Sequence, residues 1–464
     1  MSNLALIMAA GQGTRMKSNT PKVLHQILDA PLVQYVISAA QAAGCERTLV
    51  VTGHQREDVE AILPDTVEIV YQPDRIGTAN TVLTAEEALA GIDGKLVVLS
   101  GDVPLLRPET LQALMDACAG SAMAVLTAHV DNPEGYGRIL RNEYGTISGI
   151  VEEKDATEEQ RLITEINTGI YCFELDGLFD RLRKIGNDNA QHEYYLTDIV
   201  QVCLDEEASV GSITVSDASE TLGVNSRVQL AAATRVMQQR INEAWMMSGV
   251  TMVAPELCWV APDVTLEPDT TLLPMTFLSG ATKIASGCVI GPDTRIINSS
   301  IGAGSQVDSS IVLYSEVGSR AHIGPRAYLR PGCVLEDDVK IGTSVELKGS
   351  HVGAGTKIPH LSYVGDAEIG AGVNIGAGSI TCNYDGIKKS RTVIGDGAFI
   401  GSSTMIVAPV TIGAHATTGA ASAITKDVPD GALAVERGDQ AIIEKWAQRR
   451  HSGDNADAPG KEAH

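Results

Sequence analysis

The sequence predicts a chain of two parts, an α/β domain built on a mostly parallel sheet followed by a parallel β-helix. Two observations predict this fold class. In the first half, short apolar runs alternate with glycine-containing loops and amphipathic helical segments, which is the pattern of βα units in a sheet covered on both faces. In the second half, aliphatic residues recur at every sixth position, a period that belongs to neither an α-helix nor a single strand.

Length and composition exclude several classes of protein. The 464 residues suffice for two or three domains. A net charge of -23 argues against binding to nucleic acid, because the negatively charged phosphates are bound by positively charged surfaces. No apolar run reaches the roughly 18 residues of a membrane span, and the N-terminus MSNLALIMAAGQG lacks the features of a secretory signal. Eight cysteines without a CxxC pair indicate reduced thiols. We therefore expect a soluble, cytoplasmic protein with no nucleic-acid partner and no membrane span.

The first half contains successive strand, loop and helix signals. An apolar run at 4–10 ends in a glycine loop, an amphipathic segment covers 32–44, and the next apolar run lies at 48–51. The pattern continues with an apolar run at 95–99 and a helical segment at 109–119. Ligands of parallel sheets sit at the carboxyl ends of the strands. The loops that follow residues 10 and 99 should therefore converge on one site.

These two loops carry residues suited to phosphate chemistry. The loop AAGQGTRM includes Arg15, and Lys22 follows shortly after it. The string fits neither the P-loop nor the GxGxxG pattern, and two glycines also occur in ordinary turns. Backbone N–H groups with two cations nevertheless suit a triphosphate whose α-phosphorus is attacked. Asp102, after the second apolar run, offers the hard oxygen that Mg²⁺ prefers, or it caps a turn.

The second half is defined by its six-residue period. Residues 249–435 contain 25 of the 46 glycines, against 18 in residues 1–248. An aliphatic residue followed by glycine every six residues is typical of a parallel β-helix, whereas an antiparallel sandwich would show period two. A polar insertion at 381–392 interrupts the repeat. The repeating aliphatic positions are Ile284, Ile290, Ile296, Val317, Ile323, Leu329, Leu335, Ile341, Leu347, Val352, Ile358, Val364, Ile369, Ile375, Ile394, Ile400, Ile406 and Ile412.

These patterns divide the chain into four segments. The α/β domain is expected over 1–225 and a helix-rich linker over 226–248. The β-helix is expected over 249–435, and a C-terminal segment over 436–464 ends in a polar tail for which we predict disorder.

Motifs in both halves resemble known families. The six-residue repeat resembles the left-handed β-helix of the hexapeptide acyltransferases, which implies a homotrimer with substrates bound between subunits. The motifs AAGQGTRM, PKVLH, GD, YGR, VEEKDA, EINTGI and GVNSR occur in the order found in sugar-1-phosphate nucleotidylyltransferases, whose domain is Rossmann-like. The whole chain resembles the family of bifunctional enzymes that join N-acetylglucosamine-1-phosphate uridylyltransferase to glucosamine-1-phosphate N-acetyltransferase.

The resemblance implies a role for each matching position of the first half. Arg15 and Lys22 would be catalytic cations on the phosphates of UTP, and Asp102 and Asn225 would ligate Mg²⁺. Ser100 and Gly101, beside Asp102, would belong to the nucleotide and sugar site. The uracil and ribose would be held by Met8, Ala9, Ala10, Gly11, Gln72, Gly77 and Thr78, and the N-acetylglucosamine by Gly137, Glu152 and Asn167. Three departures from the family pattern, at Gln12, Ser100 and the GTANT string of 77–81, leave base and sugar affinity open.

The β-helix carries its own set of polar residues. Roughly eighteen residues per coil would stack Arg330 over Lys348, creating a positive patch for a phosphorylated substrate. A lone histidine is more often structural, but the resemblance implies that His360 is the general base that takes a proton from the substrate amine. It also implies that Lys389 joins Arg330 and Lys348 on the phosphate. The sugar would be held by Tyr363 and Asn374, and acetyl-CoA by Ala377, Asn383, Tyr384, Ser402, Ala420 and Arg437.

The function that follows has two steps. Acetyl-CoA would acetylate glucosamine-1-phosphate, and UTP would then convert N-acetylglucosamine-1-phosphate to UDP-N-acetylglucosamine for cell-envelope precursors, with Mg²⁺ and release of pyrophosphate. The alternative is a single-activity nucleotidylyltransferase whose β-helix only trimerises or regulates. A third reading, a pure assembly protein, would leave the first half unexplained. His360, Lys348 and the insertion favour two activities, because a scaffold needs none of them.

Overall fold

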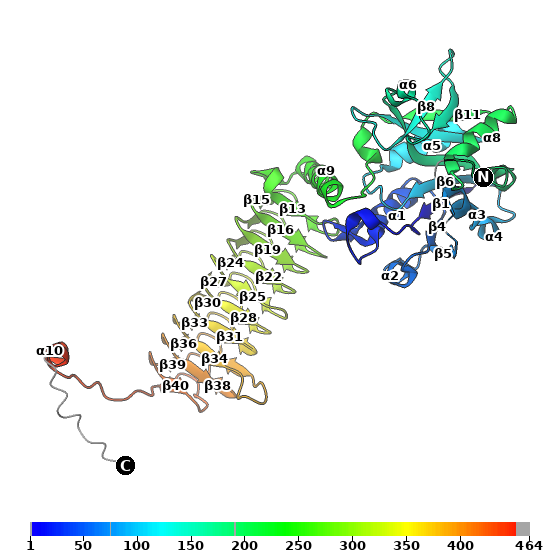
Figure 1. Ribbon diagram of the computed structural model, residues 1–464. Helices are drawn as coiled ribbons and strands as arrows, with labels where there is room; N and C mark the ends of the chain where they lie inside the picture. The colour runs from blue at the N-terminus through cyan, green and yellow to red at the C-terminus, as the bar shows by residue number, and fades with distance from the viewer. Residues whose placement is uncertain (1, 75, 190–191, 452–464) are drawn as a thin grey trace. The chain divides into compact units, whose positions relative to one another are not determined.

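The computed structural model describes residues 2–74, 76–189 and 192–451. The chain forms two compact units (Figure 1). The first runs to residue 265 and includes 274–282, and the second comprises 266–273 and the chain from 283 onward. Within the described ranges, no helix is both long and apolar enough to cross a membrane. The tail at 452–464, for which the sequence predicts disorder, lies outside the described residues.

A mostly parallel sheet forms the centre of the first unit, with the strand order β11-β7-β10-β6-β1-β4-β5. β1 pairs in parallel with β4 and β6, whereas β10 is antiparallel to β6 and β7. Met8 is in register with Ser100, so the loops after β1 and β6 leave the sheet side by side. The strands are β1 (Ser2–Met8), β4 (Arg47–Thr52), β5 (Glu68–Tyr71), β6 (Gly94–Ser100), β7 (Met123–His129), β8 (Gly137–Arg141), β9 (Ile147–Val151), β10 (Glu165–Glu174) and β11 (Val210–Thr214), with a separate pair β2 (Gln26–Ile27) and β3 (Ala30–Pro31).

Helices cover both faces of this sheet (Figure 1). Alternate residues of β1 point to opposite faces. Ala5 and Ile7 join the core under α1 and α5, whereas Leu4 and Leu6 join the core under α3, α7 and α8. The helices are α1 (Leu32–Ala42), α2 (Arg56–Glu60), α3 (Thr78–Leu83), α4 (Glu86–Leu89), α5 (Pro108–Cys118), α6 (Glu158–Arg161), α7 (Leu178–Leu182) and α8 (Ile199–Asp205).

A long helix, α9 (Arg227–Met247), follows this sheet and belongs to the first unit. Its Ser226 cap accepts a hydrogen bond from the Gln229 backbone. Two buried polar side chains of α9 reach the first coil of the solenoid: Gln238 Nε2 donates to the Cys258 carbonyl at 2.8 Å, and Asn242 Nδ2 donates to the same carbonyl at 3.0 Å. Within the first unit, the helix thus satisfies the backbone carbonyl of Cys258 at the start of β13. Three strands of this part are β12 (Thr251–Met252), β13 (Cys258–Val260) and β16 (Thr276–Ser279).

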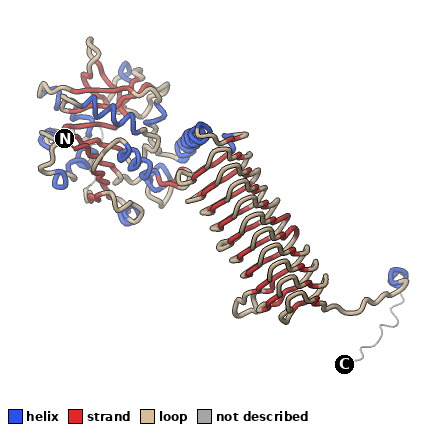
Figure 2. Tube along the Cα trace, turned by 180° about the vertical axis from the view of Figure 1, so that it is seen from behind, coloured by secondary structure: helices blue, strands red, loops and turns tan. Residues whose placement is uncertain are grey.

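The second unit winds into three parallel sheets, and Figure 2 shows their strands stacked coil upon coil. The first sheet contains β15 (Thr271–Leu272), β18 (Val289–Ile290), β21 (Gln306–Val307), β24 (His322–Ile323), β27 (Lys340–Thr343), β30 (Lys357–His360), β33 (Asn374–Ile375), β36 (Phe399–Ile400), β39 (Thr417–Thr418) and β41 (Leu433–Ala434). The second contains β19 (Thr294–Ile297), β22 (Ile311–Leu313), β25 (Tyr328–Leu329), β28 (Glu346–Lys348), β31 (Tyr363–Gly365), β34 (Ile380–Cys382), β37 (Met405–Val407) and β40 (Ala423–Ile424). The third contains β17 (Lys283–Ile284), β20 (Ser300–Ile301), β23 (Glu316–Val317), β26 (Val334–Leu335), β29 (His351–Val352), β32 (Ala367–Ile369), β35 (Thr392–Ile394) and β38 (Val410–Ile412). β14 (Thr265–Leu266) contains the boundary between the units, and α10 (Trp446–His451) follows the last coil.

The aliphatic repeat forms the interior of this solenoid. Every repeating position predicted from the six-residue period is at most 4 % exposed. Successive coils align them directly, as in the register of Ile323 with Ile341 and of Ile341 with Ile358. Each coil therefore buries one aliphatic residue per sheet against its neighbours. The predicted fold class, a mostly parallel α/β domain followed by a β-helix of hexapeptide repeats, is confirmed.

Candidate active sites

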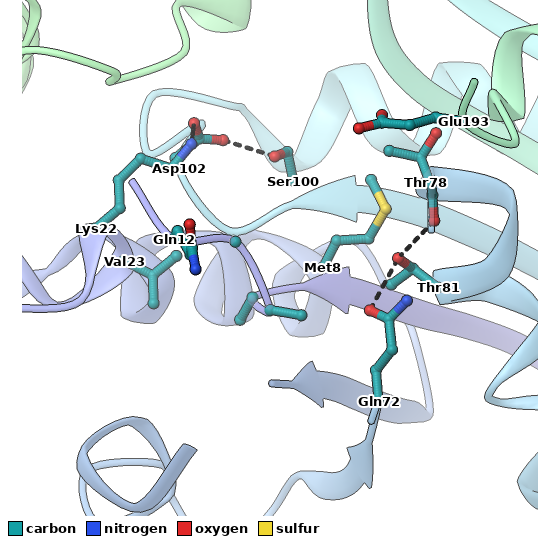
Figure 3. A pocket seen from close by; sticks show the side chains of 14 residues that line it. Met8, Gln12, Lys22, Val23, Gln72, Thr78, Thr81, Ser100, Asp102 and Glu193 are labelled. Atoms are coloured by element: carbon teal, nitrogen blue, oxygen red, sulfur yellow. Dashed lines mark hydrogen bonds and ion pairs between the residues drawn. The ribbon is translucent and has the colours of Figure 1, made fainter. Parts of the chain in front are cut away.

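A pocket of about 520 Å³ opens at the carboxyl ends of β1 and β6 (Figure 3). Nearly all of the sequence-predicted nucleotide residues line it. Four further residues also line it. Two of them, Gln12 and Thr81, lie at positions where the sequence departs from the family pattern, whereas the sequence analysis missed Val23 and Glu193, for which a single sequence carries no signal. The predicted lining residues are Met8, Ala9, Ala10, Gly11, Lys22, Gln72, Gly77, Thr78, Ser100 and Asp102.

One end of the pocket holds an immobilised amide. Gln72 is buried, and its Oε1 accepts a hydrogen bond from Thr81 Oγ1 at 3.1 Å (Figure 3). Its Nε2 donates to the Asp74 carbonyl at 3.0 Å. Thr78 Oγ1 accepts from the Leu196 backbone at 2.9 Å, which joins this end of the pocket to the segment that carries Glu193. A fixed amide of this kind suits recognition of a planar polar base.

The opposite end of the pocket holds a cluster of cations and oxygens. Lys22 Nζ lies 2.5 Å from Asp102 Oδ2 and 3.1 Å from Asn225 Oδ1. Arg15 Nη2 donates to the same Asn225 oxygen at 2.9 Å, and Ser100 Oγ donates to Asp102 Oδ1 at 2.6 Å. Asp102 is only 5 % exposed. The structure therefore brings together five predicted residues that lie as far apart as 210 positions in the chain.

Gly13 allows Lys22 to lie close to the loop that follows β1. Gly13 adopts a φ of 59° in the loop after β1. A Cβ at this position would lie 2.6 Å from Lys22 Cβ. The loop thus needs glycine both for its left-handed conformation and for the space that Lys22 occupies.

A second cluster in the first unit contains the three predicted sugar residues. Asn167 of β10 is in register with Gly137 of β8, and a Cβ at Gly137 would lie 3.4 Å from Glu152 Oε1. Asn167 Nδ2 donates to the Tyr171 hydroxyl at 2.7 Å, which fixes the amide. Burial raises the pKa of the Glu152 carboxyl. Beside it, Thr197 Oγ1 is buried and has no hydrogen bond of ordinary geometry among the described residues, and the sequence analysis missed it.

Cations of the β-helix gather on adjacent coils. Leu329 and Leu347 are in register, so the next residues, Arg330 and Lys348, stack as predicted from the coil length. Arg330 Nη1 forms an ion pair with Glu346 Oε1 at 3.0 Å. Lys389, from the insertion, lies close enough to Lys348 that the neighbouring ammonium lowers the pKa of Lys389. This is a compact site for a phosphate group on an otherwise acidic chain.

A carboxylate that the sequence analysis missed lies within this cluster. Lys348 Nζ lies 3.2 and 3.3 Å from the two carboxylate oxygens of Asp366, and Asn383 Nδ2 donates to Asp366 Oδ2 at 2.6 Å. The Tyr363 hydroxyl is also near, since a Cβ at Gly365 would lie 2.5 Å from it and 2.7 Å from Asn383 Nδ2. The six-residue period does not mark Asp366; the residue closes the string PHLSYVGD around His360, but the string gives it no role.

His360 is the last residue of β30, and its side chain is exposed. The His360 carbonyl accepts a hydrogen bond from the Gly378 backbone N–H at 3.4 Å. Ala377, which precedes Gly378, therefore lies on the neighbouring coil next to His360. The Ser403 backbone donates to the Ala377 carbonyl and that of Ala421 to the Ser402 carbonyl. Asn374 lies in β33, in register with Lys357 of β30, the strand that ends at His360. Three further predicted residues are exposed: Ala420 on the next coil, Tyr384 in the insertion and Arg437 after β41.

The fold and these two sites define a class of protein, a transferase whose α/β nucleotidyltransferase domain precedes a hexapeptide β-helix. Residues 5–163 match the family described as MobA-like NTP transferase domain. Three similar relatives each carry the name "Bifunctional protein GlmU". The relative from Desulfitobacterium hafniense (strain DSM 10664 / DCB-2) is 48% identical, and the match covers 96% of this chain and 98% of the relative. The relative from Halalkalibacterium halodurans is 46% identical over 97% of this chain and 100% of the relative. The relative from Streptococcus equi subsp. zooepidemicus is 44% identical over 97% of this chain and 98% of the relative.

The chain belongs to the family of bifunctional GlmU proteins. This confirms the family resemblance that the order of the motifs predicted. The matches cover both halves of the chain, so the membership extends to the β-helix as well as to the nucleotidyltransferase domain.

Proposed function

We propose that the chain makes UDP-N-acetylglucosamine in two transfer reactions, one in each half. The β-helix moves an acetyl group from acetyl-CoA to glucosamine-1-phosphate, and the α/β domain then moves a uridylyl group from UTP to N-acetylglucosamine-1-phosphate. The observation that carries the proposal is the presence of two separate clusters in which a lysine pairs with an aspartate and an asparagine joins the pair, through the lysine in the first cluster and through the aspartate in the second. The single-activity alternative is not favoured, because a scaffold has no use for the second cluster.

The uridylyl transfer requires positioning and neutralisation of charge rather than a strong base. A phosphate oxygen of the sugar substrate attacks the α-phosphorus of UTP, a new P–O bond forms, and the bond to pyrophosphate breaks. Gln72 orients the uracil, and Lys22 and Arg15 neutralise the phosphates. The sugar is held by Gly137, Glu152 and Asn167 in the neighbouring cluster.

The residues present fit a Mg²⁺ ion. The carboxylate of Asp102 and the amide oxygen of Asn225 converge on a single cationic atom, Lys22 Nζ, and both are hard oxygen donors of the kind Mg²⁺ prefers. In the described part of the chain, His, Cys, Asp and Glu side chains form no group of three or more that could hold a metal. Asp102 and Asn225 would therefore hold the ion together with substrate phosphates. When bound, Mg²⁺ supplies neutralisation of the charge on the triphosphate.

The acetyl transfer is assigned to the cluster on the β-helix. The 2-amine of glucosamine-1-phosphate attacks the thioester carbonyl, a C–N bond forms, and the C–S bond breaks. His360 takes the proton from the amine, and the departing thiolate of CoA receives a proton. Arg330, Lys348 and Lys389 hold the phosphate, which places the amine toward His360.

We assign a homotrimer in the cytoplasm to this enzyme. The tip of the insertion supports assembly, since Ile387 is 93 % exposed and Tyr384 is also exposed, and exposed apolar tips of this kind serve contacts with another chain. A molar mass of three chains in light scattering would agree with this assignment. A monomer that acetylates would contradict sites shared between subunits.

The decisive experiment measures thiol release from acetyl-CoA on addition of glucosamine-1-phosphate, in the wild type and in His360→Ala. We expect release that depends on the sugar and falls by about 10²- to 10⁴-fold in the variant, the usual contribution of a general base. Pyrophosphate release from UTP and N-acetylglucosamine-1-phosphate serves as the internal control and should be unchanged. Thiol release absent from the wild type, with pyrophosphate still formed, would reduce the β-helix to a scaffold.

A further inference from the structure

Asp366 joins two parts of the β-helix site that have separate ligands in the proposed function. Its carboxylate accepts hydrogen bonds from Lys348, which is assigned to the sugar phosphate, and from Asn383, which is assigned to acetyl-CoA. Asn383 is only 7 % exposed although it lies within the polar insertion, so its side chain is held at this contact. One carboxylate thus sets the distance between the two ligand-binding groups.

The backbone fixes the place of this carboxylate. Asp366 has a φ of 50°, a conformation that asparagine and aspartate tolerate better than other residues with a Cβ. Its N–H donates to the Lys348 carbonyl on the preceding coil at 2.8 Å, and its own carbonyl accepts from the Thr392 backbone at 3.3 Å. The residue is therefore anchored between the coil of Lys348 and the far end of the insertion that contains Asn383 and Lys389.

The electrostatic surroundings also depend on Asp366. Burial by itself would raise the pKa of Asp366, but the hydrogen bond from Asn383 and the ammonium of Lys348 hold it below the ordinary value. Lys389 interacts with the same carboxylate, and Arg330 and Lys348 repel Lys389. The carboxylate thus keeps Lys348 and Lys389 together when no phosphate is bound, while Arg330 pairs with Glu346.

We propose that Asp366 is a positioning residue for acetyl transfer, which holds Lys348 and Asn383 in register so that the amine meets the thioester. This inference rests on the proposed acetyltransferase function. Asp366 touches neither reacting atom, and its contribution is the relative placement of the two ligands. Such placement changes the rate of the bound complex more than the affinity for either substrate.

Another aspartate of the solenoid offers a matched control. Asp338 also has a positive φ, of 61°, and its carboxylate also pairs with a cation 18 positions earlier, Arg320, at 2.8 and 2.9 Å. This pair is more than half exposed and contacts no residue assigned to a substrate. Exposed pairs of this kind contribute little to stability, because solvent screens the interaction. Asp338→Asn therefore makes the same substitution at the same kind of backbone position and in a similar ion pair, but away from the proposed active site.

The test compares Asp366→Asn with Asp338→Asn and the wild type. Asparagine keeps the left-handed conformation and the volume, so both variants should show wild-type circular dichroism and wild-type pyrophosphate release. We expect kcat for thiol release to fall about 10- to 100-fold in Asp366→Asn, with KM for glucosamine-1-phosphate changed less than threefold. The KM should change little because two effects on the affinity for the sugar phosphate oppose each other. Loss of a negative charge beside the phosphate strengthens its binding, whereas the looser hold on Lys348 weakens it. Asp338→Asn should match the wild type in every constant.

A second measurement separates positioning from charge alone. In the double variant Asp366→Asn with Asn383→Ala, the fall in kcat should be smaller than the product of the falls in the two single variants, because both changes remove one shared contact. Multiplying effects would overturn the inference, as would a kcat in Asp366→Asn equal to the wild type with a lowered KM for the sugar phosphate. An inactive wild type would instead refute the proposed function itself.

Discussion

The ion pair between Lys22 and Asp102 leads to a prediction about metal binding by the free protein. Lys22 Nζ contacts the two oxygens, of Asp102 and Asn225, that are assigned to Mg²⁺. A divalent ion that enters this position in the absence of nucleotide must displace the ammonium. We therefore predict that Lys22→Met binds a divalent ion more tightly than the wild type before any substrate is added.

The magnitude follows from the contacts that the metal must break. Lys22 and Asp102 have side-chain exposures of 18 and 7 %, so solvent screens their interaction only partly. A hydrogen bond to a charged group contributes about 1.5–3 kcal/mol. Removal of this competing interaction corresponds to about 10- to 150-fold tighter binding. Relief of the repulsion between the ammonium and the incoming ion acts in the same direction.

The assay titrates Mn²⁺ into the nucleotide-free protein and measures free Mn²⁺ by electron paramagnetic resonance. Lys17→Met is the control, because Lys17 is an exposed lysine of the same loop. It should leave the Mn²⁺ affinity unchanged, and Asp102→Asn should weaken binding in the Lys22→Met background. Equal or weaker Mn²⁺ binding by Lys22→Met would refute the reasoning, because it would show that Lys22 does not compete for these oxygens. Uridylyl transfer should fall in Lys22→Met, since the phosphates lose a cation.

Two further predictions concern the first unit. Gly13→Ala should lower kcat/KM for pyrophosphate release by about tenfold, because its Cβ would clash with Lys22 and its backbone would be strained by about 1–2 kcal/mol. Thiol release is the control and should be unchanged, which would show that the β-helix is intact. Pyrophosphate release at the wild-type rate would contradict the close packing of Gly13 against Lys22. Glu152→Gln should raise the melting temperature at pH 8 but not at pH 4.5. Burial raises the pKa of Glu152, so its ionised form costs folding energy that is absent below the ordinary value of 4.5, grows as the pH rises from there to the raised pKa, and is fully present above it. The same variant should raise KM for N-acetylglucosamine-1-phosphate about tenfold by loss of a charged hydrogen-bond acceptor, and a melting temperature that rises equally at both pH values would exclude the titration of Glu152 as the cause.

Local and periodic features of this chain could be predicted from the sequence. The six-residue repeat defines the β-helix because each coil presents nearly the same surroundings to its aliphatic residue, so Ile341 and Ile358 report the same structure as their neighbours. The convergence of the loops after β1 and β6 follows from a general property of parallel sheets. Family motifs extended this to individual positions, and the structure places Lys22, Asp102 and Asn225 in one cluster.

Tertiary structure alone decided which groups act on one another. Asp366 lies at the bend between β31 and β32 and has no place in the aliphatic repeat, yet its carboxylate joins Lys348 to Asn383. Lys22 is 203 positions from Asn225, and no local pattern encodes the contact between them. Periodicity describes what each residue shares with its neighbours in sequence. Contacts between distant side chains depend instead on how whole strands and loops pack, which becomes determined only when the chain has folded.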